Sequence, residues 1–176
     1  IQNEFNKRGI KSQVRLFAEL VESLSDEGWR KSIETFLWNK RFNIIVDDEY
    51  CYEAMSILNE KNIYGTSVIL TDRIPETEIE ENSAASVLNI TNKSARRYAN
   101  YLLNGLYLCQ NLEELHEHPK GGITKDGMLC KSYAASKMQI HKTALCLGNN
   151  VVKIQLEQAR KELESLSLEQ SGYEKD

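Results

Sequence analysis

The sequence lacks several patterns by which common classes of function are recognised. None of its apolar runs approaches the roughly 20 residues that cross a bilayer, and its mean hydropathy is −0.49. It contains no G-x-x-x-x-G-K-[ST] and no G-x-G-x-x-G, the glycine-rich loops that hold phosphates. A net charge of −4 argues against a uniformly basic nucleic-acid binder and is compatible with a local basic patch. We therefore expect no membrane span and no nucleotide-binding loop.

Cysteine and histidine are scarce, which limits metal and nucleophile chemistry. The four cysteines show no C-x-x-C spacing, and we expect reduced thiols in the cytoplasm rather than disulfides. His116 and His118 form an H-x-H pattern after acidic residues, but a metal site needs further ligands at compatible spacing. A small cytosolic α/β enzyme or metal-binding domain that uses His116, His118 or Cys109 stays open as an alternative. We assign no catalytic residue, metal ligand or cofactor to this chain.

The apolar pattern of the central part predicts a mixed α/β or α+β domain with small sheets. Asp47-Asp48 are interpreted as a helix cap, because negative side chains stabilise a helix N-terminus. In chain order we expect a helix over 26–39, a strand over 42–46, a helix after Asp47-Asp48, a strand over 66–70, an acidic loop over 71–83, a strand over 86–90 and a helix that ends at Asn104-Gly105.

The stretch over 105–133 organises the rest of the chain. An apolar run over 106–109 predicts a buried strand, and an acidic helix over 111–118 follows it. Pro119 ends this helix, because its ring cannot continue the helical backbone.

The second part of this stretch predicts a β-hairpin. Gly121-Gly122 open one strand, residues 128–133 form the returning strand, and the turn at 125–127 contains a glycine that supplies a positive φ. Because a hairpin edge beside glycines can be approached closely, we expect a homodimer through this hairpin. The predicted contact residues are Gly121, Gly122, Ile123, Gly127, Met128, Leu129 and Tyr133.

Two stretches near the ends of the chain repeat the same apolar spacing. Residues 10–24 and 152–166 place apolar side chains at steps of four and three, which is typical of a coiled-coil seam. We expect an antiparallel pair of helices that leave the globular part together; two terminal helices packed on the core are the alternative. The seam residues are Ile10, Val14, Phe17, Val21 and Leu24 in the first stretch, and Val152, Leu156, Ala159, Leu163 and Leu166 in the second.

An internal repeat divides the central part. Each half places an apolar helix before a strand, an acidic helix after it, and then a strand introduced by glycine, so we expect two half-domains with pseudo-twofold symmetry. Because Ile1 falls where the pattern predicts the middle of a helix, we expect a fragment of a longer protein. The predicted divisions are an N-terminal coiled-coil helix over 1–25, a globular domain over 26–150 with halves 26–85 and 86–150, and a C-terminal coiled-coil helix over 151–176.

This layout resembles the hinge of SMC proteins. F-N-I-I-V-D-D-E, A-M-S-I-L and Y-G-T-S-V-I-L-T-D are similar to the first half of that family, and Y-A-N-Y-L-L-N-G-L-Y-L-C-Q-N-L-E-E-L and G-G-I-T-K-D-G to the second. The resemblance covers the chain from Trp29 to Ser136. More narrowly, I-T-K-D-G-M with a basic strand and A-L-C-L-G-N is similar to the SMC-like subunit (JetC) of Wadjet anti-plasmid systems. SMC hinges usually carry glycines after the Asp-Gly turn, whereas residues 131–138 carry none.

The resemblance implies a non-enzymatic hinge and dimerisation domain that joins two coiled-coil arms in a DNA-organising or plasmid-defence complex. Its partner would be a second copy, with no membrane involved. The parent protein would be an ATPase whose remote heads bind ATP and Mg²⁺ and contact kleisin-type subunits, located in the cytoplasm with the nucleoid or plasmid. A stand-alone coiled-coil adaptor is a further alternative.

Basic residues gather at the start of the helix near position 95 and again over 120–142. An ordinary solvated face is one interpretation. Weak contact with the backbone of double-stranded DNA is the other, because phosphate binding needs clustered cations rather than a basic chain. The candidate DNA-binding residues are Arg96, Arg97, Lys131, Lys137 and Lys142.

Overall fold

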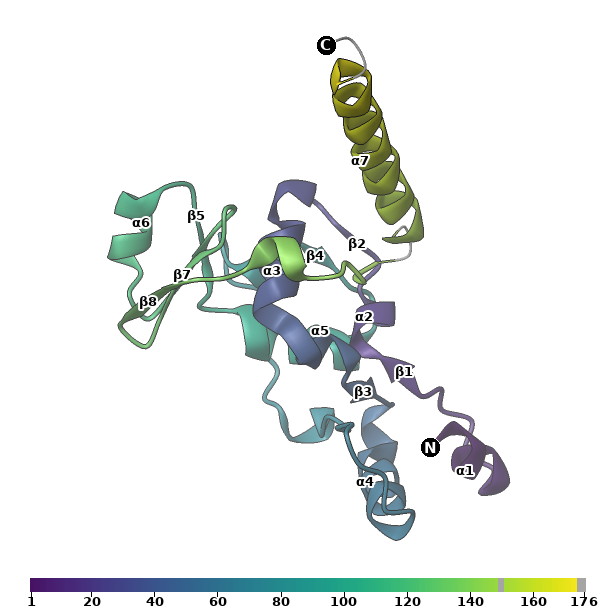
Figure 1. The fold of residues 1–176 in the computed structure, drawn as a ribbon. Helices are drawn as coiled ribbons and strands as arrows, with labels where there is room; N and C mark the ends of the chain where they lie inside the picture. Colours follow the sequence, from purple (N-terminus) through teal and green to yellow (C-terminus); the bar gives the residue numbers. More distant parts are fainter. Residues whose placement is uncertain (149–150, 174–176) are drawn as a thin grey trace.

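The computed structural model describes residues 1–148 and 151–173 (Figure 1). Its central part is a mixed α/β body from which the C-terminal helix projects at one end, while the first helix lies at the other. The chain begins with four short elements, which are α1 (Gln2–Lys7), β1 (Arg15–Leu16), α2 (Phe17–Leu20) and β2 (Ser23–Leu24).

These short elements show that the predicted N-terminal coiled-coil helix is wrong. β1 pairs antiparallel with β3 (Ile44–Ile45), and β2 pairs antiparallel with β4 (Leu88–Asn89). The seam residues Phe17, Val21 and Leu24 are buried in the main core, and Ile10 and Val14 pack against a smaller apolar cluster. Tertiary burial overrides the helical spacing here. Part of the core therefore lies before residue 25, so the predicted domain boundary at this residue is too late in the chain.

The next part of the chain follows the predictions more closely. The predicted helix over 26–39 is present as η1 and α3, with Asp26 accepting a hydrogen bond from the Gly28 N–H at 2.9 Å. Residues 66–70 form no regular strand and contribute one parallel bridge, Val68 with Ile44. The elements are η1 (Glu27–Trp29), α3 (Arg30–Leu37), η2 (Trp38–Phe42), β3 (Ile44–Ile45), η3 (Asp48–Tyr50), α4 (Cys51–Glu60) and η4 (Thr71–Arg73), where η marks a 3₁₀ helix.

The second half contains the only sheet of more than two strands in the described chain. Asn92 and Asn111 cap its two helices by accepting hydrogen bonds from backbone N–H groups, each at 2.9 Å. The elements are η5 (Ala84–Val87), β4 (Leu88–Asn89), α5 (Lys93–Leu103), β5 (Tyr107–Cys109), α6 (Leu112–Glu117), β6 (Gly121–Thr124), β7 (Met128–Lys131), β8 (Ala134–Lys137) and η6 (Ile140–Lys142).

The four-stranded sheet has the order β5-β6-β7-β8, with β5 parallel to β6 and the remaining pairs antiparallel. The predicted hairpin turn is confirmed, and Gly127 has a φ of +91°. The predicted returning strand over 128–133 is too long. The chain turns again at Ser132-Tyr133, which have φ values of +50° and +65°, and comes back as β8. A tight hairpin turn with two positive φ angles usually contains glycine or asparagine, so the sequence did not predict this one.

The main apolar core is shared by both predicted halves. Phe17 from α2 packs edge-on against Tyr98 of α5, with ring centroids 5.1 Å apart. Ile33 and Leu37 of α3, together with Leu147 near the end of the body, belong to the same buried cluster. A core of this kind joins elements that are far apart in sequence.

The predicted C-terminal helix is present as α7 (Val151–Tyr173), 23 residues long. The predicted antiparallel pair is wrong, because residues 10–24 lie in the body and α1 lies at the opposite end from α7 (Figure 1). Seam residues Leu156, Leu163 and Leu166 are 53%, 71% and 62% exposed. Ala159 is exposed as well, and the Val152 side chain lies outside the described residues. Among the described helices, none combines the length and apolar character that a bilayer crossing requires.

Candidate dimerisation surface

The predicted hairpin edge is not free. β6 lies inside the sheet, with β5 on one side and β7 on the other, so its backbone groups are paired within the chain. The premise that β6 offers an edge to a partner is therefore wrong. Of the predicted contact residues, Gly121, Gly122, Ile123 and Gly127 are buried, Met128 and Leu129 are half-buried, and Tyr133 is exposed.

The two adjacent glycines of β6 serve close packing inside the chain. A Cβ at Gly121 would lie 2.0 Å from the carbonyl oxygen of Gly105, and a Cβ at Gly122 would lie 2.9 Å from Cδ1 of Leu115. Both approaches are far shorter than a normal van der Waals contact. The fold therefore requires glycine at 121, where the obstacle is backbone, whereas at 122 the nearest atom is the end of the Leu115 side chain, which can shift.

The free edge of this sheet belongs to β8. All four residues of β8 are exposed, and no strand or bridge lies on its outer side among residues 1–148 and 151–173. The N–H of Met138 donates to the carbonyl of Gly127 at 2.9 Å, which sets the phase of the β7–β8 ladder. Because backbone groups alternate in direction along a strand, those of Ala135 and Lys137 face outward.

A second free edge lies in the first half. Ile44 of β3 donates to the Ser67 carbonyl at 2.8 Å and accepts from the Ile69 N–H at 3.0 Å. In this pattern the N–H and C=O of Val68 face away from β3. Within the described part of the chain no backbone partner meets them.

An exposed tyrosine precedes each of the two edges, and the edges lie apart in space. Tyr133 precedes β8 and is 73% exposed, and Tyr64 precedes the 66–70 segment and is 86% exposed. Figure 1 places β8 at one side of the body and β3, which carries the 66–70 segment, at another. The two edges therefore cannot pair with each other in one chain.

The two arginines predicted to contact DNA are occupied inside the chain. Arg96 donates to the carbonyls of Ala85 and Leu88, and burial lowers the pKa of its guanidinium below the ordinary value. Arg97 forms ion pairs with Asp48 and Glu76, each at 2.6 Å. Neither guanidinium is left to meet a phosphate, which removes the premise for including them in a DNA site.

The three predicted lysines stand differently. Lys137 pairs with Asp126 at 2.6 Å, and Lys131 lies over the ring of Phe36 at 5.1 Å. Lys142 is exposed at the end of η6. DNA contact through these lysines stays a prediction.

The Asp48 carboxylate has a role that sequence reasoning missed. It accepts hydrogen bonds from Thr71 at 2.6 Å, Ser94 at 2.7 Å and Arg97 at 2.6 Å, and so links the start of α4 to η4 and α5. Burial alone would raise the pKa of Asp48, but these hydrogen bonds and the charge of Arg97 outweigh it and hold the pKa below its ordinary value. As predicted, Asp47 lies at the N-cap position of η3 and Asp48 in its first turn, but the Asp47 side chain makes no capping hydrogen bond.

The residues of the alternative enzyme or metal site do not form one. His118 stacks on Tyr107 with centroids 4.3 Å apart, and burial raises the pKa of the Cys109 thiol. No group of three or more His, Cys, Asp or Glu side chains in the described residues is placed to hold a metal ion. No nucleophile with an adjacent base emerges from these contacts.

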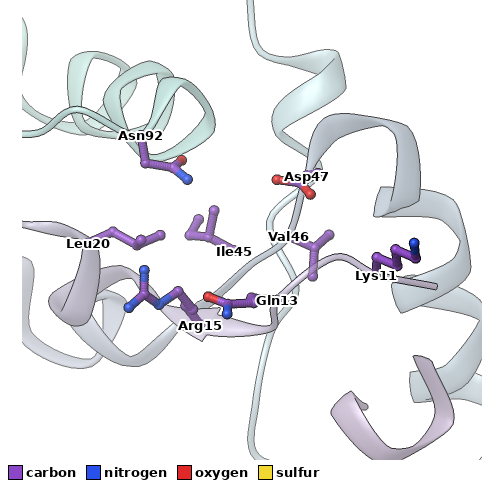
Figure 2. Close-up of a pocket in the computed structure, with 8 residues that line it drawn as sticks. All are labelled: Lys11, Gln13, Arg15, Leu20, Ile45, Val46, Asp47 and Asn92. Atoms are coloured by element: carbon purple, nitrogen blue, oxygen red, sulfur yellow. The ribbon is translucent and has the colours of Figure 1, made fainter. Parts of the chain in front are cut away.

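A polar pocket of about 320 Å³ lies beside β1 at the start of α5 (Figure 2). Arg15, Lys11 and Asn92 are among the residues that line it. Asp47 stands on its rim. The pocket combines charges of both signs without a nucleophile and base, so it does not assign a reaction.

Comparison with known proteins identifies the family of this fold. The family model described as "SMC proteins Flexible Hinge Domain" matches residues 12–117, well over half of the chain. The chain belongs to the SMC hinge family. SMC hinge domains mediate dimerisation of the SMC arms. This role agrees with the two unpaired strand edges, at β8 and at residues 66–70, which could pair with a second chain. Comparison with curated proteins gives no match.

Solved structures show the same fold. The SMC hinge domain of Pyrococcus furiosus is 21% identical with a TM-score of 0.61, over 84% of each chain. The same hinge with an extended coiled coil is 21% identical with a TM-score of 0.59, over 95% of this chain and 62% of that one. An asymmetric dimer of the Geobacillus stearothermophilus SMC hinge domain is 16% identical with a TM-score of 0.56, over 77% of this chain and 63% of that one.

Proposed function

We propose that this SMC hinge forms a homodimer in which β8 of each copy pairs with the 66–70 segment of the other. The observation that carries the proposal is the presence of two unpaired backbone edges that cannot reach each other within one chain. An edge strand offers a row of unpaired N–H and C=O groups, and pairing with another chain is the direct way to satisfy them.

Twofold symmetry makes this arrangement closed. If β8 of the first copy pairs with 66–70 of the second, the axis makes β8 of the second pair with 66–70 of the first. The β8 edge and the 66–70 edge of each copy are then both used, and no open filament results. Tyr64 and Tyr133, exposed beside the two edges, would cover the ends of each junction with aromatic surface.

The experiment is a mass measurement on matched variants of one outward-facing residue. Ala135→Pro removes an outward N–H, which an edge position tolerates inside its own sheet. Ala135→Ser keeps that N–H and is the control. By sedimentation at micromolar concentration we expect twice 20.2 kDa for the parent and the serine variant, and a shift towards 20.2 kDa for the proline variant.

Two results would overturn the proposal. A parent chain that sediments at 20.2 kDa at these concentrations forms no such dimer. A proline variant that keeps both its circular dichroism spectrum and the full dimer mass places the interface elsewhere, for example on the predicted residues Met128 and Leu129.

The parent protein proposed for this hinge is an SMC-type ATPase that organises chromosomal or plasmid DNA. Its heads would bind ATP and Mg²⁺ and meet kleisin-type subunits outside this chain, and α7 would continue as an arm. The motif I-T-K-D-G-M with the basic strand after it supports the narrower placement near the Wadjet subunit. Flanking sequence tests the SMC parent: long heptad regions that end in nucleotide-binding motifs are expected, and their absence contradicts it.

A further inference from the structure

The segment that leads into α7 is held by charged side chains rather than by a sheet. Residues 144–147 form no strand, yet Leu145 and Leu147 are buried. The Glu34 carboxylate of α3 accepts hydrogen bonds from the N–H of Cys146 at 2.7 Å and of Leu147 at 2.5 Å. One buried side chain thus provides the acceptors that a neighbouring strand would normally supply.

Two arginines bind the backbone carbonyl groups of the same segment. Arg41 donates to the carbonyl of Ala144 at 2.6 Å, and Arg30 donates to the carbonyl of Leu147. Their guanidinium nitrogens lie 3.6 Å and 4.0 Å from the Glu34 oxygens. Arg30, Glu34 and Arg41 are 2%, 0% and 4% exposed. We call these three residues the charged clamp.

The clamp is tight but incompletely satisfied. Oε2 of Glu34 is buried and makes no hydrogen bond within the described residues, and its nearest guanidinium nitrogen, on Arg30, is 4.0 Å away. A buried charge without full pairing keeps a large desolvation cost. Water that reached Oε2 would relieve this cost, which favours local opening at the clamp over opening of the apolar core.

The root of α7 is tied to the segment that the clamp holds. Gln155, in the first turns of α7, donates to the Leu145 carbonyl at 2.5 Å. Glu157 and Lys161 of α7 line a cavity of about 380 Å³ together with Arg30 and Lys31. Beyond this junction α7 projects away from the body (Figure 1).

We propose that the charged clamp is the joint that sets the direction of α7 relative to the hinge body. In the closed state, which this structure shows, Glu34 holds residues 146 and 147 against α3. The hydrogen bond from Gln155 to Leu145 then fixes α7 relative to the same segment. In the open state the segment leaves Glu34, water enters, and α7 turns while the four-stranded sheet stays folded. The joint lies within one chain and is independent of the proposed dimer contacts.

Native-state amide hydrogen exchange of the unmodified protein is the first test. In dilute denaturant the amides of Cys146 and Leu147 are expected to exchange through a local opening while the Ile123 amide stays protected. If they exchange only together with Ile123, through global unfolding, the clamp does not open separately and the proposal fails.

Matched variants give the second test. Glu34→Gln is expected to speed exchange at Cys146 and Leu147 by about tenfold or more, because hydrogen bonds to a charged acceptor become bonds to a neutral one. Glu60→Gln is the control, since its exposed ion pair with Arg8 joins α1 and α4 and lies away from the clamp. It should leave both rates within about threefold. Equal rates in Glu34→Gln and the parent would overturn the role of Glu34, and a Glu34→Gln chain that does not fold leaves the first test decisive.

The direction of α7 needs its own readout. Spin labels on unnatural side chains at Lys31 and Lys161, which line the same cavity, are expected to give a broader distance distribution in Glu34→Gln than in Glu60→Gln. A distribution that is unchanged while the Cys146 and Leu147 amides are loosened would show that α7 is held by other contacts. Dimer mass is read on the same samples, so a failure of the dimer is recorded separately.

Discussion

Residues 10–24 and 152–166 carry the same apolar spacing and are used in different ways. The first stretch is broken into β1, α2 and β2, and its residues Phe17, Val21 and Leu24 are buried. The second is one helix whose leucines remain exposed. Local propensity permits a helix over 10–24 as well, so burial against distant residues decides the difference. Apolar spacing therefore identifies a face that needs a partner, but not whether that partner is the chain's own core.

The largest expected effect separates these two stretches. Phe17→Ala should destabilise the chain by about 3–5 kcal/mol, because the ring is fully buried against Tyr98 and leaves a cavity. Leu163→Ala should change stability by less than about 0.5 kcal/mol, because the side chain is exposed. Urea unfolding at one protein concentration measures both. Similar losses from the two variants would contradict the contrast.

The same contrast exists within the predicted hairpin. Gly121→Ala should cost about 3 kcal/mol, because its Cβ would lie 2.0 Å from the backbone oxygen of Gly105, which has little room to move. Tyr133→Ala should leave the unfolding of the monomer within about 0.5 kcal/mol and weaken the dimer instead. Thermal unfolding and sedimentation of both variants give the comparison. A Gly121→Ala variant that is as stable as the parent but monomeric would contradict the packing role of this glycine and support its predicted place in the dimer interface.

The smallest expected effect on stability concerns charged side chains. It distinguishes Asp48, which pairs with Arg97 within the chain, from Lys142, which is exposed on the surface. Asp48→Asn should cost about 1 kcal/mol at neutral pH, a value reduced for the partial exposure of the carboxylate that Arg97 meets. Because the folded-state pKa of Asp48 lies below the ordinary 3.8, its stabilisation is complete above pH 3.8 and is lost as the pH falls through the folded value. The gap between parent and variant should therefore close in acid.

The matched surface change is Lys142→Gln. With Lys142 exposed at the end of η6, the variant should unfold within about 0.5 kcal/mol of the parent at every pH. Chemical denaturation between pH 2.5 and pH 7, a range set by the carboxylate titration of roughly pH 1–5, follows both variants. A gap for Asp48→Asn that stays constant down to the lowest pH would show that its carboxylate is not the group that titrates.

Elements with local causes were predictable from the sequence. The helix over 111–118, its end before Pro119 and the Gly127 turn follow from proline and glycine chemistry, and the structure has α6 and this turn in place. The resemblance gave the family, which the match over residues 12–117 establishes.

Elements with distant causes were not predictable. β8 depends on a turn in which Ser132 and Tyr133 adopt positive φ, against the usual preference of these residues. The predicted hairpin has no free edge because β5 pairs with β6 and β8 pairs with β7, which no local pattern indicates. The Asp48 contacts join residues 23, 46 and 49 positions apart along the chain. Such contacts exist only once the fold brings those positions together.

The central claim is that β8 and the 66–70 segment meet across a dimer, and exchange at one edge after a change at the other tests it most directly. In the parent chain the Val68 amide should be protected at micromolar concentration and lose protection on dilution. Ala135→Pro, which changes only the distant β8 edge, should expose the Val68 amide at the high concentration as well. A Val68 amide that exchanges equally fast in the parent dimer, the diluted parent and the proline variant would contradict the account.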